Sequence, residues 1–201
     1  MTDLSELKMK LAMSSRMLFN AGLVDYSGHI SARIPGSDHL LILPHPISRA
    51  TVKSEDMVVS DFEGKLVEGK YNAPSEVFMH ARAYKSRDDI QSVAHLHNHM
   101  VATLTMVDKP FFPASSNPGA FFGPGPLPVY KDPALIHTIE QGDAVAHALG
   151  KPWQGRCGFA SWTRLNGRGA IRRVGVCRLC RLGRGSIEIL QSCFFGTGAR
   201  L

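Results

Sequence analysis

The chain has 201 residues, and 44% of them are hydrophobic, which is enough for one domain with a substantial buried core. No run approaches the roughly 20 apolar residues that a membrane-spanning helix needs, and the N-terminus, MTDLSELKMK, has acidic residues where a signal peptide would be basic. These features argue against a membrane protein and predict a single cytoplasmic domain over residues 1–201.

The net charge of +6 is unevenly distributed along the chain. Residues 151–201 hold ten basic residues against the single acid Glu188, a net charge of +9. Residues 1–150 hold 13 basic and 16 acidic residues, a net charge of −3. All nine histidines lie at or before His147, and all four cysteines lie after it. The chain therefore has two chemically different parts, and its basicity belongs to the second.

The first predicted element is an amphipathic helix. Asp3 and Glu6 form a capping pair, apolar residues follow at helical spacing, and Gly22 is a natural C-terminal stop. Alternating apolar residues and turn residues then predict two β-hairpins. Their four strands are expected at residues 29–34, 39–43, 57–61 and 65–68.

A second helix is predicted over residues 74–86, with Ser75 as its N-cap and Glu76 in its first turn. A short strand is expected next, over residues 92–97. Two further helices are predicted on either side of a loop rich in Pro, Gly and Phe. The helices are expected at residues 100–107 and 133–149, and the loop at 110–128.

Two histidines of the predicted strand, His95 and His97, project from the same face, because successive side chains in a strand alternate. Their Cα atoms are expected about 6–7 Å apart, which lets both imidazoles reach one divalent ion, such as Zn²⁺ or Mn²⁺. The alternative is that both are polar positions on a partly buried sheet. The prediction of a metal site is strengthened by Glu76, which lies on the helix that leads into this strand.

Four short runs, in this order, resemble the class II aldolase/adducin family. They are VEG at 67–69, PSEVFMH at 74–80, SRD at 86–88 and VAHLH at 93–97. The resemblance implies an α/β (α+β-like) fold of three layers, with a central, mostly antiparallel sheet flanked by helices, commonly assembled as a homotetramer. It also implies that His95 and His97 bind a divalent metal and that Glu76 is the catalytic acid/base.

The run GHISARIPG at 28–36 helps to distinguish the branches of this family. Its sugar-phosphate aldolases and epimerases have Gly-Asn where this chain has Gly28 and His29, and a Thr-Pro-Ser-Gly-like loop where it has LPHPI at 43–47. Replacing small residues with His and Pro removes space and hydrogen-bond donors for a phosphate. The run instead resembles the metal-dependent decarboxylases that act on hydroxylated aromatic or pyridine dicarboxylates.

The resemblance thus implies a lyase whose partner is a small-molecule carboxylate. His29, Arg33, His45 and Arg49 are possible partners for its carboxylates, the alternative being that each is an ordinary strand or loop residue. The metal would chelate a substrate carboxylate and an adjacent hydroxyl oxygen, and Glu76 would deliver the proton that replaces CO₂. The alternative function is an aldolase or epimerase acting on a sugar or sugar phosphate.

The resemblance weakens in the basic C-terminal part. Arg168 stands where the family has its third metal ligand, a histidine, and a protonated guanidinium cannot bind a metal. Residues 152–201 are rich in Gly, Arg and Cys, so we interpret them as aberrant, with a frameshifted stretch between two compensating indels or sequencing errors within about 152–184, and as truncated at Leu201. One competing hypothesis is an inactive scaffold with a basic arm that binds nucleic acid, although the arm has few lysines. Another is a non-catalytic module like adducin.

Overall fold

The structure is a computed structural model that describes residues 3–97, 128–132 and 134–150, together with the backbone of two strands at 157–165 and 171–180. In chain order, its elements are α1 (Leu4–Asn20), β1 (His29–Arg33), β2 (His39–Ile42), the 3-10 helix η1 (Ser54–Asp56), β3 (Val58–Asp61), β4 (Leu66–Glu68), α2 (Val77–Ser86), β5 (Ser92–Leu96), α5 (Ile139–Ala148), β6 (Cys157–Leu165) and β7 (Ile171–Cys180). Within these ranges, no helix is long and apolar enough to cross a bilayer.

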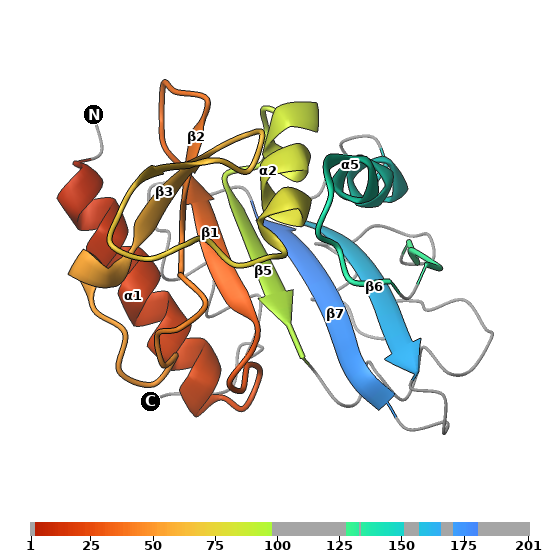
Figure 1. Cartoon of the computed structure of the whole chain (residues 1–201), viewed down its shortest axis with the longest axis horizontal. Coiled ribbons are helices and arrows are strands. Elements are labelled where there is room, and N and C mark those ends of the chain that lie inside the picture. Colours follow the sequence, from red (N-terminus) through yellow and green to blue (C-terminus); the bar gives the residue numbers. More distant parts are fainter. Residues whose placement is uncertain (1–2, 98–127, 133, 151–156, 166–170, 181–201) are drawn as a thin grey trace.

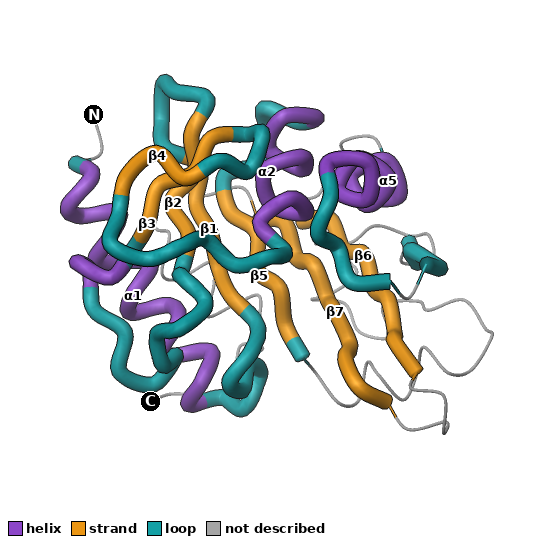
Figure 2. Tube along the Cα trace, viewed as in Figure 1, coloured by secondary structure: helices purple, strands orange, loops and turns teal. Residues whose placement is uncertain are grey.

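The described strands form one sheet of seven, in the order β4-β3-β2-β1-β5-β7-β6 (Figure 2). Every pair of neighbours in it is antiparallel. Both predicted hairpins are confirmed, since β1 pairs with β2 and β3 pairs with β4. β1 also pairs with β5, which places His29 directly opposite His95.

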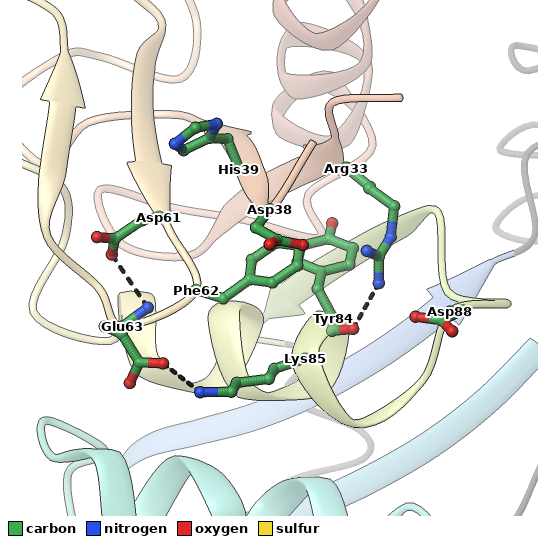
Figure 3. Close-up of a pocket in the computed structure, with 9 residues that line it drawn as sticks. All are labelled: Arg33, Asp38, His39, Asp61, Phe62, Glu63, Tyr84, Lys85 and Asp88. Atoms are coloured by element: carbon green, nitrogen blue, oxygen red, sulfur yellow. Dashed lines mark hydrogen bonds and ion pairs between the residues drawn. The ribbon is translucent and has the colours of Figure 1, made fainter. Parts of the chain in front are cut away.

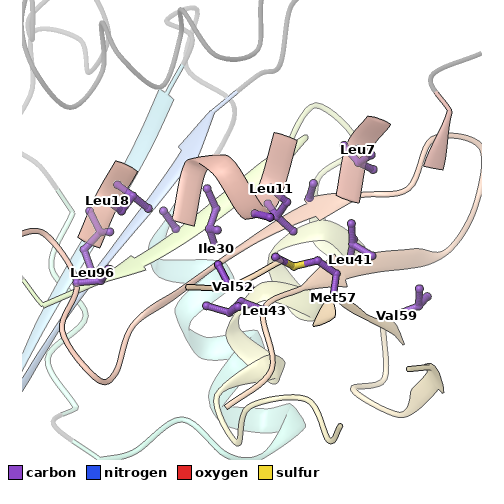
Figure 4. Packing of buried hydrophobic residues seen from close by; sticks show 14 residues of the cluster. Leu7, Leu11, Leu18, Ile30, Leu41, Leu43, Val52, Met57, Val59 and Leu96 are labelled. Carbon is purple, nitrogen blue, oxygen red and sulfur yellow. The ribbon is translucent and has the colours of Figure 1, made fainter. Parts of the chain in front are cut away.

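Helix α1 covers one face of this sheet (Figure 4). Asp3 caps the helix as predicted, by accepting a hydrogen bond from the Ser5 amide, whereas Glu6 pairs with Lys10. The buried leucines of α1 pack against apolar side chains that alternate along the strands, among them Ile30, Leu41, Leu43, Val59 and Leu96. Burial of each such side chain contributes roughly 1.5–3 kcal/mol to the hydrophobic stabilisation of the fold.

Helices α2 and α5 pack against each other and cover the opposite face (Figure 1). Gly142 of α5 allows their close approach, because a Cβ atom there would lie 2.6 Å from the carbonyl oxygen of Phe78. Their apolar side chains pack on the strand residues that point away from α1, including Leu40, Ile42, Val58 and Val93. The molecule therefore has three layers, with the sheet between α1 and the α2/α5 pair.

Two helix starts differ from the predictions. The N-cap of α2 is Glu76 and not Ser75, whose hydroxyl instead donates a hydrogen bond to the Glu76 carboxylate. The last predicted helix begins at Ile139 and not near residue 133, because Thr138 caps it by accepting a hydrogen bond from the Gln141 amide. The helix predicted at 100–107 and the loop at 110–127 lie outside the described residues.

Candidate functional site

Two imidazoles converge where β5 ends. His95 is the fourth residue of β5 and is buried, and His97 directly follows the strand. Their Nε2 atoms lie 2.9 Å apart, and their ring planes are perpendicular. Two nitrogens bound to one ion at about 2.0–2.1 Å lie roughly 3 Å apart when they occupy neighbouring positions of its coordination shell. The spacing of this pair therefore fits two ligands of one divalent ion.

The loop between α1 and β1 supports His97 in this role. Asp25 Oδ1 lies 3.4 Å from His97 Nδ1, and the backbone amide of His97 donates a hydrogen bond to the carbonyl oxygen of Leu23. A carboxylate beside Nδ1 favours the proton on that nitrogen and leaves the Nε2 lone pair for a metal. Asp25 was not predicted from the sequence.

A divalent ion fits His95 and His97 as two of its ligands. Among the residues that the structure describes, no three His, Cys, Asp or Glu side chains form a group that could hold an ion. Arg168, at the position expected for a third ligand, lies outside them. Any further ligands must therefore come from water, substrate or residues beyond the described ranges.

Glu76 lies at the start of α2, beside His29, and only 5% of it is exposed. Its Oε2 atom accepts a hydrogen bond of 2.9 Å from the Ser75 hydroxyl and lies 3.8 Å from His29 Nε2. His29 in turn lies against His95 across the β1/β5 pair, with ring centroids 4.9 Å apart. The structure thus brings the predicted catalytic residue, both predicted metal ligands and His29 into one cluster.

Gly28 makes the close approach of β1 to β5 possible. Its φ of 82° lies in the left-handed region that favours glycine. A Cβ atom there would lie 3.0 Å from both the carbonyl oxygen of His95 and a methyl group of Val24. The glycine that precedes His29 in the sequence is therefore required by both its conformation and its surroundings.

Arg49 reaches the same region from the loop after β2. It is buried, and it donates hydrogen bonds from Nε to the carbonyl oxygen of Gly28 and from Nη1 to that of His45. Its Nη2 atom is also buried and has no hydrogen-bond partner among the described residues. Burial lowers the pKa of Arg49, while the negative charges of Asp25 and Glu76 raise it. A guanidinium keeps its charge in such surroundings, so Nη2 remains a cationic donor.

His29 continues into a chain of buried hydrogen bonds that was not predicted from the sequence. His29 Nδ1 lies 2.9 Å from His80 Nε2, and His80 Nδ1 lies 2.7 Å from the Ser31 hydroxyl. That hydroxyl is also 2.7 Å from the hydroxyl of Tyr84. The sequence spacing could have indicated this chain. His29 and Ser31 are two apart and so share a strand face, and His80 and Tyr84 are four apart and so share a helix face.

The remaining predicted substrate residues are placed differently. Arg33 lies at the other end of β1, beside a cavity of about 360 Å³, where it stacks over Phe62 (Figure 3). Its guanidinium donates to three backbone carbonyls, those of Tyr84, Arg87 and Ile90. The structure does not bring Arg33 to the histidine cluster. His45 is exposed and contributes its backbone carbonyl to Arg49.

Comparisons with known proteins agree with this arrangement. The Class II Aldolase and Adducin N-terminal domain matches residues 9–161. The 3,4-dihydroxyphthalate decarboxylase of Arthrobacter keyseri is 30% identical over 152 residues, which are 70% of this chain and 61% of that protein. The enzyme of the same name from Rhodococcus jostii (strain RHA1) is 28% identical over 161 residues, 74% of this chain and 66% of that one.

This chain therefore spans less than two thirds of the length of either decarboxylase. A solved structure of L-fuculose 1-phosphate aldolase has the same fold, with a TM-score of 0.70 at 22% identity. The match covers 98% of this chain and 84% of the aldolase. The predicted three-layer fold with a central antiparallel sheet is confirmed.

Proposed function

Because the chain belongs to the class II aldolase and adducin family, we propose that it is a metal-dependent lyase that decarboxylates a hydroxylated aromatic or pyridine dicarboxylate. The observation that carries this proposal is one cluster, in which the buried Glu76 carboxylate faces His29, and His29 lies against His95, whose imidazole converges with that of His97. Two relatives named as decarboxylases of a dihydroxylated aromatic dicarboxylate support the substrate class.

In this proposal, His95 and His97 hold the divalent ion, Zn²⁺ or Mn²⁺, which when bound supplies a Lewis acid for the substrate oxygens. When the C–CO₂ bond breaks, its electron pair stays on the ring carbon, and that carbon must then receive a proton. Glu76 is the buried carboxyl group that faces His29 in this cluster, so it holds and delivers this proton. Its hydrogen bond from Ser75 fixes the orientation of the carboxyl group.

Arg49 is the proposed partner for the carboxylate that the substrate keeps. A buried carboxylate needs a charge-assisted hydrogen bond, and Nη2 of Arg49 is a buried cationic donor with no partner among the described residues. His29 and His45 are the other proposed polar contacts. Arg33 is left out of the proposal, since its N–H groups already donate to backbone carbonyls.

The test is an assay of the purified chain with Mn²⁺ or Zn²⁺ against 3,4-dihydroxyphthalate. Release of CO₂, with deuterium incorporated at the ring carbon when the solvent is D₂O, is the expected result. Cleavage of L-fuculose 1-phosphate without any CO₂ release would support the aldolase alternative. Salt-sensitive nucleic-acid binding by a chain that takes up no metal would support the inactive scaffold. Light scattering tests the predicted homotetramer separately.

A further inference from the structure

The hydrogen-bonded chain behind His29 has a direction, and that direction decides which nitrogen of His29 carries the proton. The chain runs from the Tyr84 hydroxyl through Ser31 and His80 to Nδ1 of His29, with every separation between 2.7 and 2.9 Å. All four side chains are buried. A charged imidazole is costly to bury without full solvation, so the hydrogen bonds are assigned with both imidazoles neutral.

A neutral imidazole has one N–H donor and one acceptor nitrogen, so the hydrogen bonds that join Ser31, His80 and His29 run in one of two directions. In the first, Tyr84 donates to Ser31, Ser31 donates to His80 Nδ1, and His80 Nε2–H donates to His29 Nδ1. His29 then carries its proton on Nε2. In the second direction His29 Nδ1–H donates to His80 Nε2, His80 Nδ1–H donates to the Ser31 oxygen, and His29 Nε2 is left as a bare lone pair.

Glu76 distinguishes the two directions. His29 Nε2 faces Glu76 Oε2 at 3.8 Å, and Nε2 makes no hydrogen bond among the described residues. An N–H dipole that points at an ionised carboxylate is attracted to it, whereas a lone pair is repelled, and burial strengthens both effects. The first direction is therefore the stable one while Glu76 is ionised.

We infer that His80, whose Nδ1 accepts from Ser31, fixes His29 in the tautomer that presents Nε2–H to the Glu76 carboxylate. His80 and Ser31 are thus positioning residues that act on Glu76 through His29. Tyr84 supplies a hydrogen bond to the Ser31 oxygen, but it is not needed for the direction of the chain. The tautomer follows from the fold while Glu76 is ionised, and only its effect on turnover rests on the proposed function.

Long-range ¹H–¹⁵N NMR of the Zn²⁺-loaded chain, labelled with ¹⁵N-histidine, tests the inference directly. The signals are assigned by their loss in His29→Gln and His80→Gln. Both residues are expected to be protonated on Nε2 and unprotonated on Nδ1. A proton on Nδ1 of His29 in the unaltered protein would overturn the inference, whatever the variants do.

Two variants test which side chains fix the tautomer. Ser31→Ala removes the donor to His80, so mixed tautomers of both histidines are expected, with kcat about tenfold lower and KM within about twofold. Tyr84→Phe keeps the donation from Ser31 to His80, so unchanged tautomers are expected. A change of tautomers in Tyr84→Phe would contradict the inference, in which the Tyr84 hydroxyl is not needed. Tyr71→Phe serves as the control, because it removes the same hydroxyl from a tyrosine that is not part of these hydrogen bonds.

The outcomes also separate this inference from the proposed function. If no decarboxylation occurs with either metal but the predicted tautomers are observed, the proposed function fails and the positioning of His29 stands. If decarboxylation occurs but Ser31→Ala leaves both the tautomers and kcat unchanged, only the inference fails.

Discussion

The two faces of the sheet differ in the side chains that the same strands place on them. On the α1 face, Ile30 and Ala32 of β1 lie in an apolar cluster with the leucines of the helix. On the α2 face, His29 and Ser31 of the same strand lie in a layer that combines apolar packing with buried hydrogen bonds. Buried polar groups are costly unless each has a partner, so this second layer depends on several precise contacts. Substitutions on the first face should thus change stability alone, and those on the second should change chemistry.

The largest expected effect is that of Glu76→Gln on the α2 face. The amide keeps the size of the side chain but cannot exchange a proton, so kcat is expected to fall by about 10²- to 10⁴-fold. The free energy of unfolding, measured by urea denaturation, should change little. Substantial CO₂ release by this variant would remove Glu76 from the proposed mechanism.

Leu11→Ala tests the α1 face. Leu11 is 5% exposed within the apolar cluster, so its truncation is expected to lower the free energy of unfolding by about 2–5 kcal/mol. At temperatures where the variant remains folded, its kcat should equal that of the unaltered chain. Met9→Ala, on the exposed side of the same helix, is the matched control, with an expected change within about 0.5 kcal/mol. A specific loss of kcat in Leu11→Ala would contradict the division between the faces.

Asp25→Asn tests whether Asp25, which lies in a loop outside the sheet, helps His97 to bind the metal. The neutral amide attracts the Nδ1–H of His97 less strongly, so metal affinity is expected to fall by about 10- to 100-fold. Competition with a chelator measures this change. Asp38→Asn, on an exposed turn, should leave the affinity unaltered, and an equal loss in both variants would point to a general effect of charge.

The smallest effect expected is a pH dependence of stability from His80. Burial holds the pKa of His80 in the folded chain well below 6.5, so below about pH 6.5 the unfolded chain binds more protons than the folded chain. Stability should therefore fall with pH there, by up to about 1.4 kcal/mol per pH unit from this residue, and show no such contribution above. Urea denaturation at several pH values should give a shallower slope for His80→Gln. An unchanged slope would exclude this contribution.

Local patterns predicted the framework of the fold better than they predicted the site. Alternating residues and turn residues identified both hairpins, and Asp3 identified the start of α1. The start of α5 was missed because the Thr138 cap decides it. The role of His80 was missed because polar residues on a helix usually face solvent, and only the packing of α2 on β1 buries it.

Arg33 lies away from the histidine cluster, and its role in substrate binding stays a prediction. A basic residue near His29 in the sequence was expected to bind substrate, yet the extended strand carries it away to three carbonyls at the end of α2. The aberrant nature of residues 152–201 stays a prediction, and resequencing of the gene tests it. A corrected reading with histidine at position 168 would supply the expected third ligand.

His29 pairs with His95 across β1 and β5, so the site is sensitive to deletions in these strands. Loss of an odd number of residues has a different effect from loss of an even number. Deletion of one residue within β5 before His95 could preserve the backbone hydrogen bonds, yet it would turn the imidazole toward the leucines of α1. Deletion of two residues would keep the imidazole on its face but move it along β1, away from His29. Variation in length is therefore compatible with this chemistry in the turn at residues 35–38, but not in the central strands.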